Sequence, residues 1–264
     1  MKNKKLSHNG LQGSVTSVMA ALLCILIGLA VGFLVLLAIN PAHAWADGFV
    51  RILKGGFHDA PYGVGKELAN AAPLIMTGLS VGFAFKTGLF NIGAAGQYTL
   101  GAYGALYCAI MLKLPWFVCL LAAAILGGLW GAIPGFFKAY FNINEVITSI
   151  MFNWIGLYLV NELIYQNGTG PMYDVRNTRT LNLSKNADFA QSLIPDFGLN
   201  KLFQTNSTTI AIFLAAVVAI LIWVVLNKTT FGYELKAVGL NKSAARYAGI
   251  NEKKNIILSM AIAG

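Results

Sequence analysis

The sequence predicts an all-α fold, a polytopic bundle of transmembrane helices, some of them broken or kinked. Apolar residues make up 57% of the 264 positions and charged residues only 11%, whereas about a quarter of the residues of a soluble domain are charged. Apolar runs of about 20 residues, enough to cross roughly 30 Å of hydrocarbon as a helix, recur along the chain. The formal charge of +9 lies between these runs, as expected of a membrane protein, so binding to nucleic acid is not predicted.

The first predicted span covers residues 15–39, which contain no charged residue and follow three lysines, Lys2, Lys4 and Lys5. The downstream Ala42-His43-Ala44 is similar to a signal-peptide cleavage site. A signal peptide has an apolar region of only about 7–15 residues, so a retained first helix is the better prediction.

Five more complete spans are predicted from apolar runs at 68–85, 92–112, 115–137, 146–165 and 208–227. A seventh begins near Asn255 and stops at Gly264, which leaves too few residues to cross a bilayer. We therefore expect residues 1–264 to form one transmembrane domain whose C-terminal part is missing.

The basic residues predict the orientation of these spans. With the N-terminus inside, the inner segments hold eleven basic and three acidic residues, a net charge of +8, and the remaining residues carry +1. This orientation places residues 40–67 and 166–207 outside the membrane. It places the main loop, residues 228–254, inside.

Proline and glycine interrupt several spans. Segment 68–85 contains Pro73, which removes a backbone hydrogen-bond donor. Because a broken helix within a membrane needs protein or a water-filled cavity around it, this segment is either a kinked helix or part of a solute pathway. Gly127, Gly131 and Gly135 recur every four residues and predict a face on which another helix packs closely.

Three amide side chains are candidates for lining a solute pathway: Asn91, Gln97 and Asn153. Lipid would not solvate them, so we expect them to face the interior of the bundle. Two roles are open, binding of a hydroxylated solute and hydrogen bonding to a neighbouring helix. Glu145, at the start of its span, fits the positive end of a helix dipole better than a pathway.

The inner loop contains a short predicted helix, residues 242–248, which Asn241 can cap and Gly249 can end. Three small residues lie close together on one face of it: Ala244, Ala245 and Ala248. So short a helix is marginal in water. It needs a surface to pack against, either a groove of a partner protein or its own bundle.

Motifs for catalysis, metal binding and phosphate binding are absent from the sequence. It contains no GxxxxGK[ST] loop, HExxH motif, CxxC pair or GxSxG elbow. The histidines lie outside the predicted spans, and the cysteines lie in apolar runs without metal-site spacing. We therefore predict no catalytic residue, no metal and no cofactor bound by this chain.

Three stretches carry a family resemblance: LSVGFAFKTGLFNIGAAGQYTLGAYG (79–104), NINEVITSIMFNW (142–154) and GYELKAVGLNKSAARYAGINEKKNIILSMAIAG (232–264). The first and last together resemble the permease subunits of ABC importers for branched-chain amino acids, simple sugars and nucleosides. The middle stretch is similar to the simple-sugar and nucleoside branch in particular. The resemblance extends from about residue 66 to the end of the chain.

The resemblance implies a permease of the bacterial cytoplasmic membrane that imports a nucleoside or a simple sugar. Such a subunit pairs with a second permease subunit and with two cytoplasmic ATPase subunits, which use ATP. An extracytoplasmic binding protein or lipoprotein delivers the solute. The residues that match the family's ATPase-contacting loop are Gly239, Asn241, Ala244, Ala245, Gly249 and Ile250.

Two other classes compete with this interpretation. An ion-coupled secondary transporter or channel would be favoured by acidic residues within the spans, where only boundary residues such as Glu145 and Glu162 occur. A membrane-embedded enzyme, such as a lipid or isoprenoid transferase, needs clustered acids, histidines or a metal site, and the sequence shows none. We therefore expect a transport subunit and not an enzyme.

Overall fold

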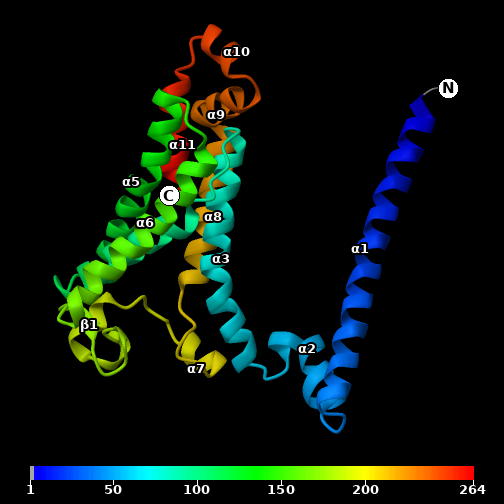
Figure 1. Cartoon of the computed structure of the whole chain (residues 1–264), viewed down its shortest axis with the longest axis vertical. Coiled ribbons are helices and arrows are strands. Elements are labelled where there is room, and N and C mark those ends of the chain that lie inside the picture. Colours follow the sequence, from blue (N-terminus) through cyan, green and yellow to red (C-terminus); the bar gives the residue numbers. More distant parts are fainter. Residues whose placement is uncertain (1–2) are drawn as a thin grey trace. The chain divides into compact units, whose positions relative to one another are not determined.

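The computed structural model describes residues 3–264 and confirms the all-α class (Figure 1). The sheet found among these residues is a hairpin of two short antiparallel strands, β1 (Tyr173–Asp174) and β2 (Arg179–Thr180). The chain divides into two compact units, residues up to Val64 and residues Gly65–Gly264. Lys2, one of the lysines used to predict the orientation, lies outside the described residues.

The first unit contains one long helix followed by short ones. α1 (Asn3–Ile39) covers the first predicted span. A helical segment follows, made of the π-helix η1 (Ala44–Phe49), α2 (Val50–Lys54) and the 3-10 helix η2 (Gly55–Phe57). Sequence analysis treats residues 40–67 only as an outer connection. The structure adds these short helices and begins the next long helix at Tyr62.

The second unit is built from long helices with short elements between them. The long helices are α3 (Tyr62–Lys86), α4 (Ala94–Ile110), α5 (Trp116–Phe141), α6 (Glu145–Tyr165) and α8 (Ala211–Lys228). Between α6 and α8 lie η3 (Gln166–Gly168), the β1–β2 hairpin, η4 (Leu183–Lys185), η5 (Ala187–Ser192) and α7 (Leu199–Phe203). After α8 come α9 (Thr230–Leu240), α10 (Lys242–Tyr247) and α11 (Glu252–Ala263).

In the part of the chain that the structure describes, five helical segments are long and apolar enough to cross a membrane: Val18–Ile39, Tyr62–Lys86, Trp116–Phe141, Glu145–Gly168 and Ala211–Lys228. The sixth predicted span, 92–112, is helical only as α4, whose 17 residues rise about 26 Å at 1.5 Å per residue. Its helix is shorter than predicted because hydrogen bonds to side chains hold residues 91–93 in a turn. Crossing of the membrane by α4 and α11 remains a prediction.

Close helix packing in the second unit depends on small residues of α5. α5 packs against both α4 and α11, and α4 also contacts α6. A methyl group added at Gly131 would lie 2.5 Å from the Met260 carbonyl oxygen of α11, and one at Gly127 would lie 2.5 Å from the Gly264 oxygen. The glycine face predicted on this helix is therefore confirmed as a packing surface.

Candidate functional site

The three predicted pathway amides meet where the connection after α3 enters α4. Asn91 Nδ2 donates to Gln97 Oε1 at 2.8 Å, and Gln97 Nε2 donates back to Asn91 Oδ1 at 3.1 Å. Asn91 Nδ2 also donates to Ser80 Oγ of α3, while its Oδ1 accepts from Gly93 N. Both amides are almost fully buried. Every donor and acceptor of the Asn91 side chain is therefore used within the protein.

Asn153 reaches the same region from α6. Its Oδ1 accepts from Gly96 N at 2.8 Å, and its Nδ2 donates to the Ile92 carbonyl oxygen at 2.8 Å. Gly96 lies in the first turn of α4, where backbone N–H groups lack a partner within the helix. A methyl group at Gly96 would lie 2.8 Å from Asn153 Cα. The glycine therefore allows a side chain of α6 to cap α4.

This geometry favours the structural role that the sequence left open for these amides. Their hydrogen bonds join α3, α4 and α6, and in this conformation the Asn91 and Gln97 side chains are buried out of reach of a solute. Asn153 is only half-buried. The assignment of the three residues to a solute pathway remains a prediction.

The exposed face of α6 is the more suitable surface for a polar solute. It carries Trp154, Tyr158, Glu162 and Tyr165, spaced three or four residues apart and all exposed. The exposed side chains of α8 are different: Phe213, Val217, Ile220 and Leu221 are all apolar and suit contact with lipid. Sequence analysis missed the α6 residues as a group because the aromatic rings fit an apolar span. The available signal was a carboxylate on the same helical face as three ring side chains.

A cavity of about 410 Å³ opens beside this face, between α6 and the β1–β2 hairpin. Its lining combines aromatic rings with charged and polar groups: Tyr158, Asn161, Glu162, Tyr165, Tyr173 and Arg179. At the end of β1, outside the cavity lining, a hydrogen bond from Asn177 lowers the pKa of Asp174. A larger cavity of about 990 Å³ lies between α4, α5 and residues 183–209, with a mostly apolar lining.

The short inner helix is capped as predicted, but its small residues do not form one shared face. Asn241 Oδ1 accepts from Ala244 N at 3.0 Å, and Gly249 follows the helix with a φ of 80°. Ala245 is 3% exposed and belongs to a buried cluster with Leu89, Val238, Ile256 and Met260. Ala244 and Ala248 are exposed. Ala245 therefore anchors α10 to its own bundle, and the other two alanines face outward.

Gly239 also has a packing role. A methyl group there would lie 2.5 Å from the Lys86 carbonyl oxygen, so the glycine lets α9 approach the connection that follows α3. Ile250 packs against the same buried cluster as Ala245. Two residues that sequence analysis did not select, Leu240 and Tyr247, are 89% and 96% exposed. A large apolar residue just before this short helix and an aromatic residue at its end were the signal that could have identified them.

Ionic contacts at this end of the bundle stabilise the connection between α5 and α6. Lys138 Nζ lies 2.8 Å from Glu145 Oε2, and both side chains are largely shielded from solvent. Asn144 Oδ1 accepts from Val146 N at 2.9 Å, which caps α6. Glu145 therefore has the helix-end position that sequence analysis favoured. Among residues 16–264 apart from residue 185, whose side chains the structure describes, no group of three or more His, Cys, Asp or Glu side chains is placed to hold a metal ion.

Comparison with known proteins identifies relatives for nearly the whole chain. Residues 65–264, the second compact unit, match the family described as the branched-chain amino acid transport system permease component. The chain is 35% identical to a guanosine ABC transporter permease of Bacillus subtilis, over 99% of this chain and 70% of that protein. It is 32% identical to a nucleoside ABC transporter permease of Lactococcus lactis, over 94% of this chain and 67% of that protein.

A third relative is a glucose ABC transporter permease of Haloferax volcanii. It is 35% identical over 87% of this chain and 60% of its own length. No solved structure matches the chain significantly.

Proposed function

Because this chain belongs to the permease family of the branched-chain amino acid transport systems, we propose that it is the membrane-spanning subunit of an ABC importer for nucleosides or simple sugars. The observation that carries the substrate class is the similarity to guanosine, nucleoside and glucose permeases along most of the chain. Family membership and the apolar helices make it a multi-pass membrane protein. Its N-terminus faces the cytoplasm of a bacterial cell in this proposal.

The solute passes along the exposed face of α6. Tyr158 and Tyr165 offer ring faces for a base or a sugar, while Glu162 and Asn161 offer hydrogen-bonding groups to hydroxyls. Such groups are costly against lipid, so this face adjoins either water or a second permease subunit. Asn153 fixes this helix to the start of α4, and the Asn91–Gln97 pair holds that start of α4 in place. Their contact with the solute requires the amide pair to open.

Energy for transport comes from ATP hydrolysis on partner ATPase subunits, and the loop 228–254 receives them. Leu240, Tyr247, Ala244 and Ala248 present an exposed, partly apolar surface around α10. A compact surface of this kind fits insertion into a groove of another protein. Gly239, Ala245 and Ile250 hold the loop on the bundle, and Asn241 and Gly249 define the ends of the short helix. An extracytoplasmic binding protein supplies the solute.

The experiment is uptake by proteoliposomes that contain the full-length permease, its partner permease, the ATPase subunits and the binding protein. We expect uptake of a labelled nucleoside or of glucose that stops when the phosphate-loop lysine of the ATPase is replaced. Uptake of branched-chain amino acids alone would contradict the substrate class. Uptake that continues with the inactive ATPase and follows an ion gradient would instead support a secondary transporter.

A further inference from the structure

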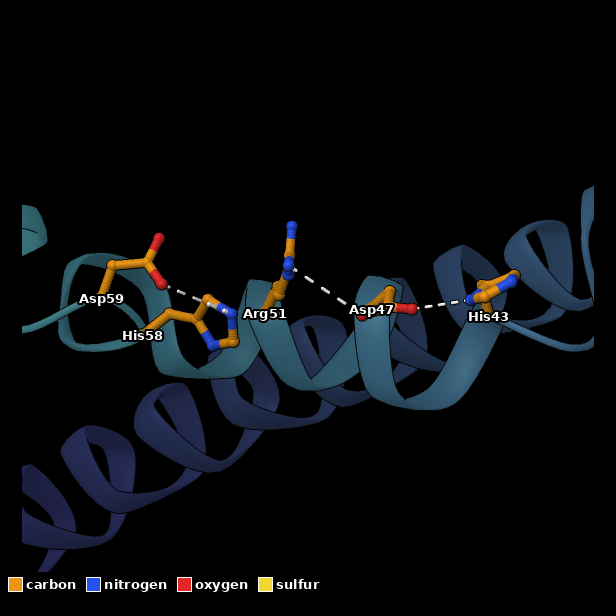
Figure 2. Close-up of polar contacts among 5 residues, drawn as sticks. All are labelled: His43, Asp47, Arg51, His58 and Asp59. Atoms are coloured by element: carbon orange, nitrogen blue, oxygen red, sulfur yellow. Dashed lines mark hydrogen bonds and ion pairs between the residues drawn. The ribbon is translucent and has the colours of Figure 1, made fainter.

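The helical segment after α1 has two chemically different faces. Polar side chains recur every three or four residues at His43, Asp47, Arg51, Lys54 and His58, the spacing that places them on one side of a helix. Figure 2 shows four of these residues in a row along the segment. His43 Nδ1 lies 2.7 Å from Asp47 Oδ2, and Arg51 lies 3.9 Å from the same carboxylate.

Large apolar side chains occupy the positions between the polar ones. Trp45, Ile52, Leu53 and Phe57 are 58–78% exposed. Four exposed large apolar side chains on one short segment are unusual for a protein surface in contact with water. Trp45 and Ile52 lie seven residues apart, about two helical turns, which places both on the side away from the polar row. Leu53 and Phe57, four residues apart, follow along the adjacent side. The segment 43–58 is therefore amphipathic.

Contacts within the first unit fix this segment at the end of the first span. The Phe33 ring of α1 lies 5.7 Å from the Trp45 ring and 4.9 Å from the Phe49 ring, and Trp45 stacks on Phe49 at 5.7 Å. A methyl group at Gly48 would lie 3.1 Å from Leu36 of α1. The apolar run of α1 ends at Ile39. The segment is thus tied to the last turns of this apolar helix.

We propose that residues 43–58 lie along the membrane–water boundary, with Trp45, Ile52, Leu53 and Phe57 inserted among the lipid chains and the polar row among the headgroups. Tryptophan is enriched at this depth, and an amphipathic helix with basic residues on its polar face binds there. Arg51 and Lys54 can contact lipid phosphates, and Asp47 holds the Arg51 side chain on the polar side. The occupant of the apolar face is phospholipid because the segment continues directly from a lipid-spanning helix.

The test measures the depth of single spin labels in the reconstituted full-length transporter. Cysteine is introduced by Ile52→Cys or Phe57→Cys on the apolar face, and by Asp47→Cys or Asp59→Cys as matched controls. Cys24, Cys108, Cys119 and any other native cysteine of the transporter are replaced by alanine. Labels are then compared for collision with oxygen, which concentrates in lipid, and with a nickel chelate, which stays in water.

We expect the labels at residues 52 and 57 to collide several-fold more with oxygen than with the nickel chelate, and the two control labels to show the reverse. Equal access of the nickel chelate to all four positions would overturn the proposal because the apolar face would then lie in water. Shielding of residues 52 and 57 from both reagents would also overturn it, since a protein would then cover the face. The measurement does not require transport, so it is independent of the proposed substrate and coupling.

Discussion

Replacement of Gln97 by leucine tests whether the buried amide pair holds the bundle together. Leucine has a similar volume but no polar group, so Gln97→Leu removes both hydrogen bonds to Asn91. Asn91 keeps its bonds to Ser80 and Gly93. One of its N–H groups and one oxygen lone pair then remain buried without a partner.

The expected loss of unfolding free energy follows from these contacts. Hydrogen bonds between membrane helices contribute about 0.6 kcal/mol each on average, so two contribute about 1.2 kcal/mol. The unpaired groups on Asn91 add a desolvation cost of about 1–3 kcal/mol. We therefore expect a loss of about 2–4 kcal/mol for Gln97→Leu. Asn91→Leu should cost more, because Asn91 also bonds to Ser80 and Gly93.

The assay is equilibrium unfolding of the full-length permease in mixed micelles with increasing sodium dodecyl sulfate, followed by circular dichroism. The two single variants and the double variant form a cycle, and we expect a coupling energy of about 1–2 kcal/mol between the two amides. Thr99→Val is the matched control, because the Thr99 hydroxyl bonds only to the Ala95 carbonyl of its own helix. It should change stability by less than about 0.5 kcal/mol.

Additive effects in this cycle would refute the pairing of the two amides. A second result would refute the structural role in a different way. If Gln97→Leu left stability unchanged but raised the KM for the solute, Gln97 would belong to the pathway, as one of the two sequence interpretations holds. Stability and transport together thus separate the two roles.

Three further predictions concern the other contacts of the bundle. Gly131→Ala should cost about 1–3 kcal/mol in the same unfolding assay by overpacking α5 against α11, whereas Gly82→Ala, with open space around it, should be neutral or slightly stabilising. Tyr247→Ala should change permease stability by less than about 0.5 kcal/mol but weaken co-purification with the ATPase, because Tyr247 is exposed. Ala245→Glu should instead impair folding, because Ala245 is buried. Unchanged co-purification of the Tyr247 variant would contradict the proposed docking surface. Glu162→Gln should raise the KM for uptake about tenfold if a hydrogen bond to the carboxylate contributes about 1.4 kcal/mol, and an unchanged KM would remove Glu162 from the solute path.

Local signals in the sequence predicted most of the secondary structure. Long apolar runs determine where helices form because each must satisfy its own backbone hydrogen bonds in lipid. Capping residues work over a few positions, so Asn241 and Gly249 were enough to place α10. The glycine face of α5 was also predictable, since four-residue spacing alone places Gly127, Gly131 and Gly135 together.

Contacts between distant residues were not predictable in the same way. Nothing local shows that Asn153 caps a helix 57 residues earlier in the chain, or that Asn91 and Gln97 satisfy each other. The orientation of α10 on the bundle determines that Ala245 is buried and Ala244 exposed, although both are alanines. The exposed face of α6 could be recognised only after the neighbours on its other face were known.

The packing around α10 connects this helix to the buried amides Asn91 and Gln97, so a displacement of α10 can reach them. Ala245 shares a buried cluster with Leu89 and Met260, so α10 cannot tilt without moving α11 or the connection before α4. Met260 contacts Gly131 of α5, and a methyl group at Gly131 would also lie 3.2 Å from Gln97 Nε2. Close-packed interiors transmit such displacements instead of absorbing them. A movement of α10 by a partner ATPase would therefore strain the Asn91–Gln97 pair. The start of α4, which this pair holds, is also the part that Asn153 of α6 binds through Gly96 and Ile92, so the strain would reach the helix that presents the exposed aromatic face.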